Sequence, residues 1–107
     1  MDPQAVLGLY ERVLALTRDM LEAARRSDWD GLVQRERERA GLVDQIKVHD
    51  PDPSRDSATR DRKREIIVDI LKGDEQIQVL SQDWMHELRE VLGSISTEQR
   101  LTRTYGP

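Results

Sequence analysis

The chain has 107 residues and a formal net charge of −4 at pH 7, with no cysteine and no phenylalanine. A nucleic-acid-binding face is strongly basic, so the acidic balance argues against direct nucleic-acid binding. Without cysteine there is no disulfide framework, thiol nucleophile or thiolate metal site. No stretch approaches the roughly 20 apolar residues of a membrane span, and the N-terminus lacks a signal-peptide pattern. We therefore expect a soluble protein with no membrane span, and the absence of cysteine is compatible with the cytoplasm.

Hydrophobic residues make up only 36% of the chain, and charged residues make up another 36%. This apolar share is below the roughly 45–50% of an average compact domain. It favours an elongated helical hairpin or bundle with much exposed charge. Because a thin core gains from a second copy, we also expect a homodimer.

Two helices are expected in the first half of the chain. Asp2 and Pro3 form a start signal, a capping acceptor followed by Pro at the first helical position. Apolar residues then recur at steps of three and four as far as Ala24. A second helix is expected to start at Ser27, which can cap it, with acidic residues in its first turn. Its predicted buried face consists of Trp29, Leu32, Val33, Ala40, Val43 and Ile46.

A long third helix is expected in the second half. Pro51 and Pro53 end the second helix, and an apolar stripe at helical spacing then runs from Ile66 to Ile95. The stripe keeps its phase through Gly73, so we expect one continuous helix that tolerates about 1 kcal/mol for this glycine. Gly93 is expected to end it. The stripe residues are Ile66, Ile67, Ile70, Ile77, Leu80, Trp84, Leu88, Val91 and Ile95.

The predicted fold is all-α: an antiparallel helical bundle of three main helices, the third one long, plus a short C-terminal helical segment. Residues 1–95 are expected to form the bundle core and residues 96–107 a C-terminal regulatory segment of the same single domain. No segment shows the alternation of period two that a strand requires.

The sequence contains no recognisable catalytic or metal-binding motif. His49 and His86 are not in a metal-binding spacing. The acidic residues around Asp50 resemble a calcium loop, but Arg55 stands where that loop needs glycine. We expect no enzyme activity, no cofactor and no metal. The basic run Arg60, Lys63 and Arg64 fits either a solvated face or contact with phosphate or an acidic partner, and the solvated face is favoured.

The two tryptophans are either core residues or anchors for a partner. Tryptophan is usually structural in a small helical domain, yet it is also the most frequent interface anchor. We favour the core for both. The predicted structural residues are Trp29, Leu32, Trp84 and Leu88.

Three segments resemble the FliT-type flagellar export chaperones. Residues 26–32 (Arg-Ser-Asp-Trp-Asp-Gly-Leu) resemble the "G-x-W-D-x-L" entry to helix two of that family. Residues 73–77 (Gly-Asp-Glu-Gln-Ile) look like its "D-N-E-Q-L/I" segment. Leu92-Gly93, followed by Thr97, Arg100 and Tyr105, is similar to its helix end and terminal segment. The resemblance spans almost the whole chain, although Lys72 and Gly73 replace residues of more helical or polar-amide character.

The resemblance implies a cytoplasmic, substrate-specific chaperone of flagellar type III export. Such proteins hold the filament-cap protein FliD by its C-terminal helical region and deliver it to the export ATPase FliI and its partner FliJ. In some enteric bacteria a member also binds the FlhDC regulator and opposes its DNA binding. The resemblance further implies that residues 96–105 fold back over part of the binding surface, with Leu101 and Tyr105 as apolar contacts.

A chaperone for a helical substrate needs an apolar helical groove. We place that groove on the second and third helices, where the apolar width exceeds what two partner helices should cover. The predicted groove residues are Val43, Ile46, Ile66, Ile67, Ile70, Leu71, Ile77 and Leu80. Two alternatives remain: a homodimeric structural or adaptor bundle without an export client, and a transcriptional co-regulator that acts by protein contact.

Overall fold

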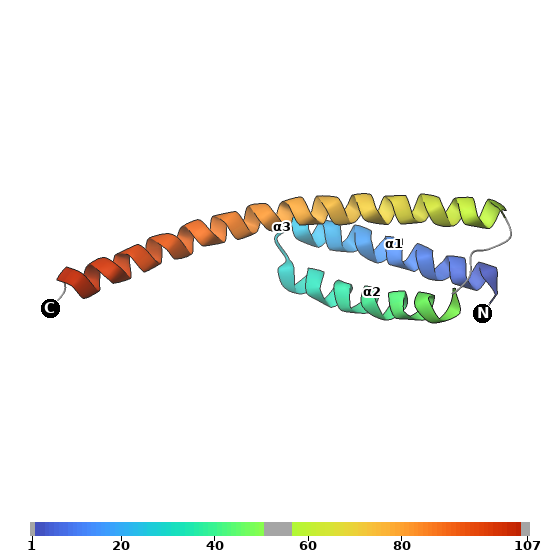
Figure 1. Ribbon diagram of the computed structural model, residues 1–107, viewed down its shortest axis with the longest axis horizontal. Helices are drawn as coiled ribbons and strands as arrows, with labels where there is room; N and C mark the ends of the chain where they lie inside the picture. Colours follow the sequence, from blue (N-terminus) through green and yellow to red (C-terminus); the bar gives the residue numbers. More distant parts are fainter. Residues whose placement is uncertain (1, 51–56, 106–107) are drawn as a thin grey trace. The chain divides into compact units, whose positions relative to one another are not determined.

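The computed structural model describes the backbone of residues 2–50 and 57–105, and the side chains of residues 2–50 and 58–93. Within these ranges the chain forms three helices and no strand (Figure 1). They are α1 (Pro3–Arg25), α2 (Trp29–His49) and α3 (Ser57–Tyr105). The predicted all-α fold is confirmed. The chain divides into two units, Met1–Ile77, which we call the bundle unit, and Gln78–Pro107, which we call the distal unit.

Short polar side chains set the starts of α1 and α2. The Asp2 carboxylate accepts a hydrogen bond from the backbone N–H of Ala5 at 2.8 Å, which confirms the predicted cap of α1. The cap of α2 is Asp28, whose carboxylate accepts from the N–H of Gly31 at 3.0 Å. The prediction of Ser27 as the cap is wrong by one residue. Ser27 instead has a φ of 58° and belongs to the turn between α1 and α2.

The core of the bundle unit lies between the hairpin of α1 and α2 and the first half of α3. In Figure 1, α2 runs antiparallel to α1, and the first half of α3 returns beside α1. Leu9, Val13 and Leu42 form a buried cluster across α1 and α2. Ile70 of α3 packs against this cluster, and Ile66 is fully buried at 0% exposure. The predicted antiparallel bundle is therefore present.

Helix α3 passes through both of its internal glycines. At Gly73 an added Cβ would lie 2.7 Å from Cγ2 of Thr17, so the missing side chain permits close packing of α3 on α1. The continuous helix predicted through Gly73 is confirmed. The predicted helix end at Gly93 is not found, because α3 continues to Tyr105. Gly93 does not take the left-handed conformation of a C-cap, and one glycine costs a helix only about 1 kcal/mol.

Candidate partner-binding surface

The structure divides the eight predicted groove residues into a covered set and an exposed pair. Ile66 and Ile77 are buried, at 0% and 8% exposure. Ile67 and Leu71 are exposed, at 40% and 61%. The other four, Val43, Ile46, Ile70 and Leu80, are half-buried. Val43, Ile46 and Ile70 pack against the core cluster. Binding of a client by these residues stays a prediction, and the exposed pair is the part that a client reaches without opening the core.

Helical phase explains this division. Ile66, Ile70 and Ile77 follow one another at steps of four and seven, so they share the face of α3 that packs on the hairpin. Ile67 and Leu71 each come one position later, which turns them about 100° away from that face. The apolar width that suggested a groove therefore consists of an inward-facing row and an outward-facing pair.

A second apolar row lies farther along α3, in the distal unit. We call it the distal stripe: Trp84, Met85, Leu88, Val91 and Leu92. Trp84 is 37% exposed and Val91 57% exposed, Met85 and Leu92 are also exposed, and Leu88 is half-buried. Four exposed large apolar side chains on three turns of one helix are typical of a protein-binding surface.

The distal stripe has the same helical phase as the buried row of the bundle unit. Trp84 and Leu88 follow Ile66 and Ile70 by 18 residues, which is five full turns at 3.6 residues per turn. In the bundle unit this face of α3 is the one that packs against helices. In the distal unit the same face leaves large apolar side chains exposed, and it therefore has the pattern of a helix that packs on another helix.

The predicted structural residues differ in burial. Leu32 is buried and Trp29 is half-buried, at the start of α2. Trp84 is exposed and Leu88 only half-buried, so a core role for this pair needs a further helix and stays a prediction. The sequence contained a signal for this difference. With 23 and 21 residues, α1 and α2 are each less than half as long as α3, which has 49.

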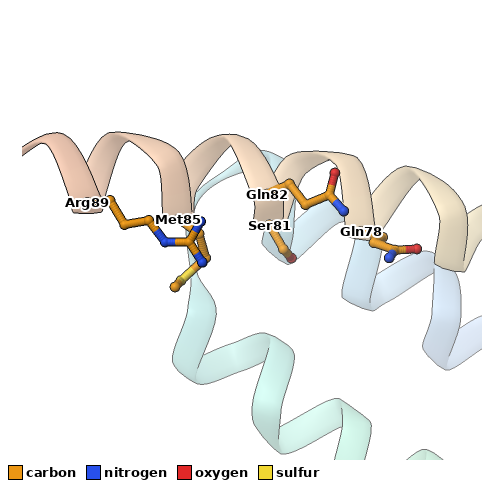
Figure 2. A pocket seen from close by; sticks show the side chains of 5 residues that line it. All are labelled: Gln78, Ser81, Gln82, Met85 and Arg89. Atoms are coloured by element: carbon orange, nitrogen blue, oxygen red, sulfur yellow. The ribbon is translucent and has the colours of Figure 1, made fainter.

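Polar side chains border the distal stripe on one side. Figure 2 shows a shallow depression on α3 whose lining side chains all come from this one helix. Met85 belongs to both the stripe and the depression, and its flexible thioether adapts to irregular partners. The lining residues are Gln78, Ser81, Gln82, Met85 and Arg89. Amide, hydroxyl and guanidinium groups beside an apolar row suit a helical ligand that is amphipathic.

A polar cluster joins all three helices and includes Asp74, which lies three residues before the bundle unit ends at Ile77. Nη1 of Arg39 donates to Oγ1 of Thr17 at 3.0 Å and to Oδ1 of Asp74 at 2.6 Å. Thr17 is almost fully buried, and its hydroxyl donates to the carbonyl of Val13 at 2.8 Å. These bonds fix the register of α3 on the hairpin only a few residues before Gln78, where the distal unit begins.

A second polar cluster joins the three helices near the end of α2. The Tyr10 hydroxyl donates to Oδ2 of Asp50 at 2.8 Å, and Nζ of Lys63 donates to the same oxygen at 2.7 Å. The Lys63 ammonium also lies 5.5 Å from the centre of the Tyr10 ring, within range of a cation–π contact. Together with Arg39, Thr17 and Asp74, this cluster fixes α3 at two levels.

The pKa values of the second cluster follow from its burial and hydrogen bonds. Burial, the hydrogen bond to Asp50 and its negative charge raise the pKa of Tyr10 to about 12. Burial alone would raise the pKa of Asp50, but hydrogen bonds from Lys63 and Tyr10 outweigh it and hold that pKa below its ordinary value of 3.8. At neutral pH Asp50 is therefore a carboxylate and Tyr10 a neutral phenol.

Within the residues that the structure describes, no group of three or more His, Asp or Glu side chains is placed to hold a metal ion. No helix in the same ranges combines the length and the apolar character needed to cross a membrane. The side chains of Leu101 and Tyr105, predicted to mask the binding surface, lie outside the described residues.

Comparison with known proteins identifies the family. The family described as "Flagellar protein FliT" matches residues 7–107. Similar proteins include "Flagellar protein FliT" of Cronobacter sakazakii, 26% identical over 100 residues (94% of this chain and 82% of the relative). The protein of the same name from Pectobacterium carotovorum is 28% identical over 104 residues (96% and 82%). No solved structure is a significant match. With nearly its whole length matched, this chain belongs to the FliT family of flagellar proteins.

Proposed function

We propose that this protein is a cytoplasmic chaperone of flagellar type III export. It holds the filament-cap protein FliD by the C-terminal helical region of FliD and delivers it to the export ATPase FliI and its partner FliJ. Membership of the FliT family supports the flagellar role. The observation that carries the binding mechanism is the distal stripe, an apolar helix face with four exposed members.

The proposed mechanism is recognition between helices. An amphipathic client helix lays its apolar side along Trp84, Leu88 and Val91, so both apolar surfaces leave water together. Trp84 is the expected anchor, because large aromatic side chains contribute most at such interfaces. Gln78, Gln82 and Arg89 lie beside the row and supply hydrogen bonds at its polar rim. While bound, the client is kept from aggregating through its own apolar side.

Two other uses of the same surface compete with this proposal. In a homodimeric adaptor bundle, a second copy of the chain would cover the distal stripe and no client would be bound. In a regulator of flagellar gene expression, the surface would bind the FlhDC complex by protein contact. In both cases the distal stripe becomes buried in the assembly. They differ from the chaperone proposal in the identity of the protein that covers the stripe.

A secretion assay tests the proposal. In motile cells that lack the chromosomal gene, wild-type protein should restore export of FliD, and the double variant Trp84→Ala/Val91→Ala should not. The matched control is Val33→Ala/Val48→Ala, which removes two exposed apolar side chains from α2. Full export with the stripe variant, at equal protein levels, would place the client elsewhere. Unchanged FliD export in the gene-deleted strain itself would reject the chaperone role.

A further inference from the structure

Four of the five residues 60–64, near the beginning of α3, are cationic: Arg60, Arg62, Lys63 and Arg64. Two of them are paired with carboxylates. Lys63 is half-buried and donates to Asp50. Arg62 lies 3.2 Å from a carboxylate oxygen of Glu65 and 3.9 Å from one of Glu11. Arg60 and Arg64 are exposed, and neither has an ion pair with any residue that the structure describes. Contacts among the described residues therefore pair only two of these four cations with carboxylates.

The two remaining arginines lie in line with exposed apolar side chains. Arg60, Arg64, Ile67 and Leu71 are separated by steps of four, three and four, which places them on one face of the helix. Ile67 and Leu71 are exposed, and Val68 widens the row on one side and is exposed as well. This outward face is turned away from the row that packs on the hairpin.

The face has a defined electrostatic polarity. The first turn of α3 contains no acidic residue, so the positive end of the helix dipole adds to the charge of Arg60. Asp61 and Glu65 are at least 80° from the centre of this face at 100° per residue. Asp74 and Glu75, about one turn beyond Leu71, are the first carboxylates that return to it, and Asp74 is paired with Arg39. The surface is thus basic at its start and apolar in its middle, in a chain of net charge −4.

We infer that Arg60, Arg64, Ile67, Val68 and Leu71 form a second docking surface, whose occupant is an acidic amphipathic helix of another protein. Carboxylates of that helix meet the two guanidinium groups, which bind them in a planar, bidentate geometry. Its apolar side covers Ile67 and Leu71. The surface lies in the bundle unit and the distal stripe in the distal unit, so this inference does not depend on the site proposed for FliD.

Paired synthetic peptides test the inference. The probe is a fluorescently labelled helical peptide with two leucines four residues apart and glutamates one and two turns beyond them. A matched peptide carries lysine in place of each glutamate. By fluorescence anisotropy, the wild-type protein should bind the glutamate peptide about tenfold more tightly than the lysine peptide. Arg60→Glu/Arg64→Glu should reverse this order, and Ile67→Ala/Leu71→Ala should weaken binding of the glutamate peptide.

Two controls separate the surface from its alternatives. Arg12→Glu/Arg37→Glu introduces the same change of net charge at two other exposed arginines, and it should leave the order of the two peptides unchanged. FliD binding should survive Arg60→Glu/Arg64→Glu, so failure of this inference and failure of the chaperone proposal give different results. The inference is overturned if the glutamate peptide does not bind the wild-type protein. It is also overturned if Arg60→Glu/Arg64→Glu and Arg12→Glu/Arg37→Glu change the binding of the two peptides in the same way. It is equally overturned if the Arg60/Arg64 variant changes only self-association in sedimentation equilibrium.

Discussion

Arg39 and Asp74 connect α2 to α3 through a 2.6 Å hydrogen bond between Nη1 of the arginine and Oδ1 of the aspartate. The side chains are 18% and 40% exposed, so solvent weakens the pair without removing it. Because the same Arg39 nitrogen also donates to Thr17, the pair determines where α3 lies on both other helices. Together with the more buried pair of Lys63 and Asp50, it holds α3 on the hairpin.

The first prediction concerns the energy of this pair. A double-mutant cycle with Arg39→Ala and Asp74→Ala, measured by urea unfolding, should give a coupling free energy of about 1 kcal/mol. The exposed pair Arg26–Glu22 is the matched control, and its coupling should be less than about 0.5 kcal/mol. Equal coupling in the two cycles would mean that the Arg39 pair adds no more than an ordinary surface contact.

The second prediction concerns Gly73. Alanine is the better helix former, yet its Cβ would meet Cγ2 of Thr17 at 2.7 Å. Gly73→Ala should therefore lower the free energy of unfolding by about 1 kcal/mol or more, because overpacking outweighs the gain in helix propensity. Thr17→Ser removes Cγ2 and keeps the hydroxyl, so it should recover part of that loss in the Gly73→Ala background.

Gly41 serves as the control for this comparison. It lies inside α2, and an added Cβ there would meet nothing within 4 Å. Gly41→Ala should raise the free energy of unfolding by about 0.5–1 kcal/mol. If Gly73→Ala and Gly41→Ala both stabilise the protein, close packing between α1 and α3 at Gly73 is refuted.

The third prediction concerns alkaline pH. The pKa of Tyr10 is raised to about 12 in the folded chain, against 10.0 for an ordinary tyrosine. A raised folded-state pKa stabilises the fold fully below pH 10, and this contribution is lost as the pH rises from 10 towards 12. In the variant Tyr105→Phe, Tyr10 is the only tyrosine, and its phenolate absorbance should appear with a midpoint near 12. A midpoint near 10 would exclude the buried hydrogen bond to Asp50.

The fourth prediction concerns the C-terminal segment. A tethered segment competes with a partner in solution at high effective concentration, even when its own contacts are weak. Deleting residues 96–107 should therefore strengthen binding of at least one partner among FliD, FliI, FliJ and FlhDC, as measured by calorimetry. Equal or weaker binding of every one of these partners by the truncated chain would refute masking.

Local signals in the sequence predicted the helices well. The Asp2–Pro3 start and the end of α2 before Pro51 depend on a few neighbouring residues, and the continuity of α3 through Gly73 follows from the phase of the apolar stripe. Predictions of single positions at helix ends were weaker. Ser27 and Asp28 are both residue types that cap helices well. Asp28 is the cap because Ser27 takes a positive φ in the turn between α1 and α2. Gly93 can end a helix or continue one, and no local feature distinguishes the two.

The binding surface was harder to predict because burial depends on which helices lie opposite a stripe. Ile66 and Trp84 have the same helical phase, yet the former is buried and the latter exposed. The two polar clusters were missed for a related reason. Thr17, Arg39 and Asp74 are far apart in the sequence, and each looks like an ordinary helix residue until the three helices are packed.

The central claim is that the distal stripe binds the C-terminal helical region of FliD. Isothermal titration calorimetry with that FliD fragment tests it most directly, using wild-type protein, Trp84→Ala/Val91→Ala and the control Val33→Ala/Val48→Ala, all of equal helicity. We predict that the stripe variant binds at least about tenfold more weakly, a loss of about 1.4 kcal/mol, and that the control binds like the wild type. Unchanged affinity of the stripe variant, or no binding of the fragment by the wild type, would contradict the claim.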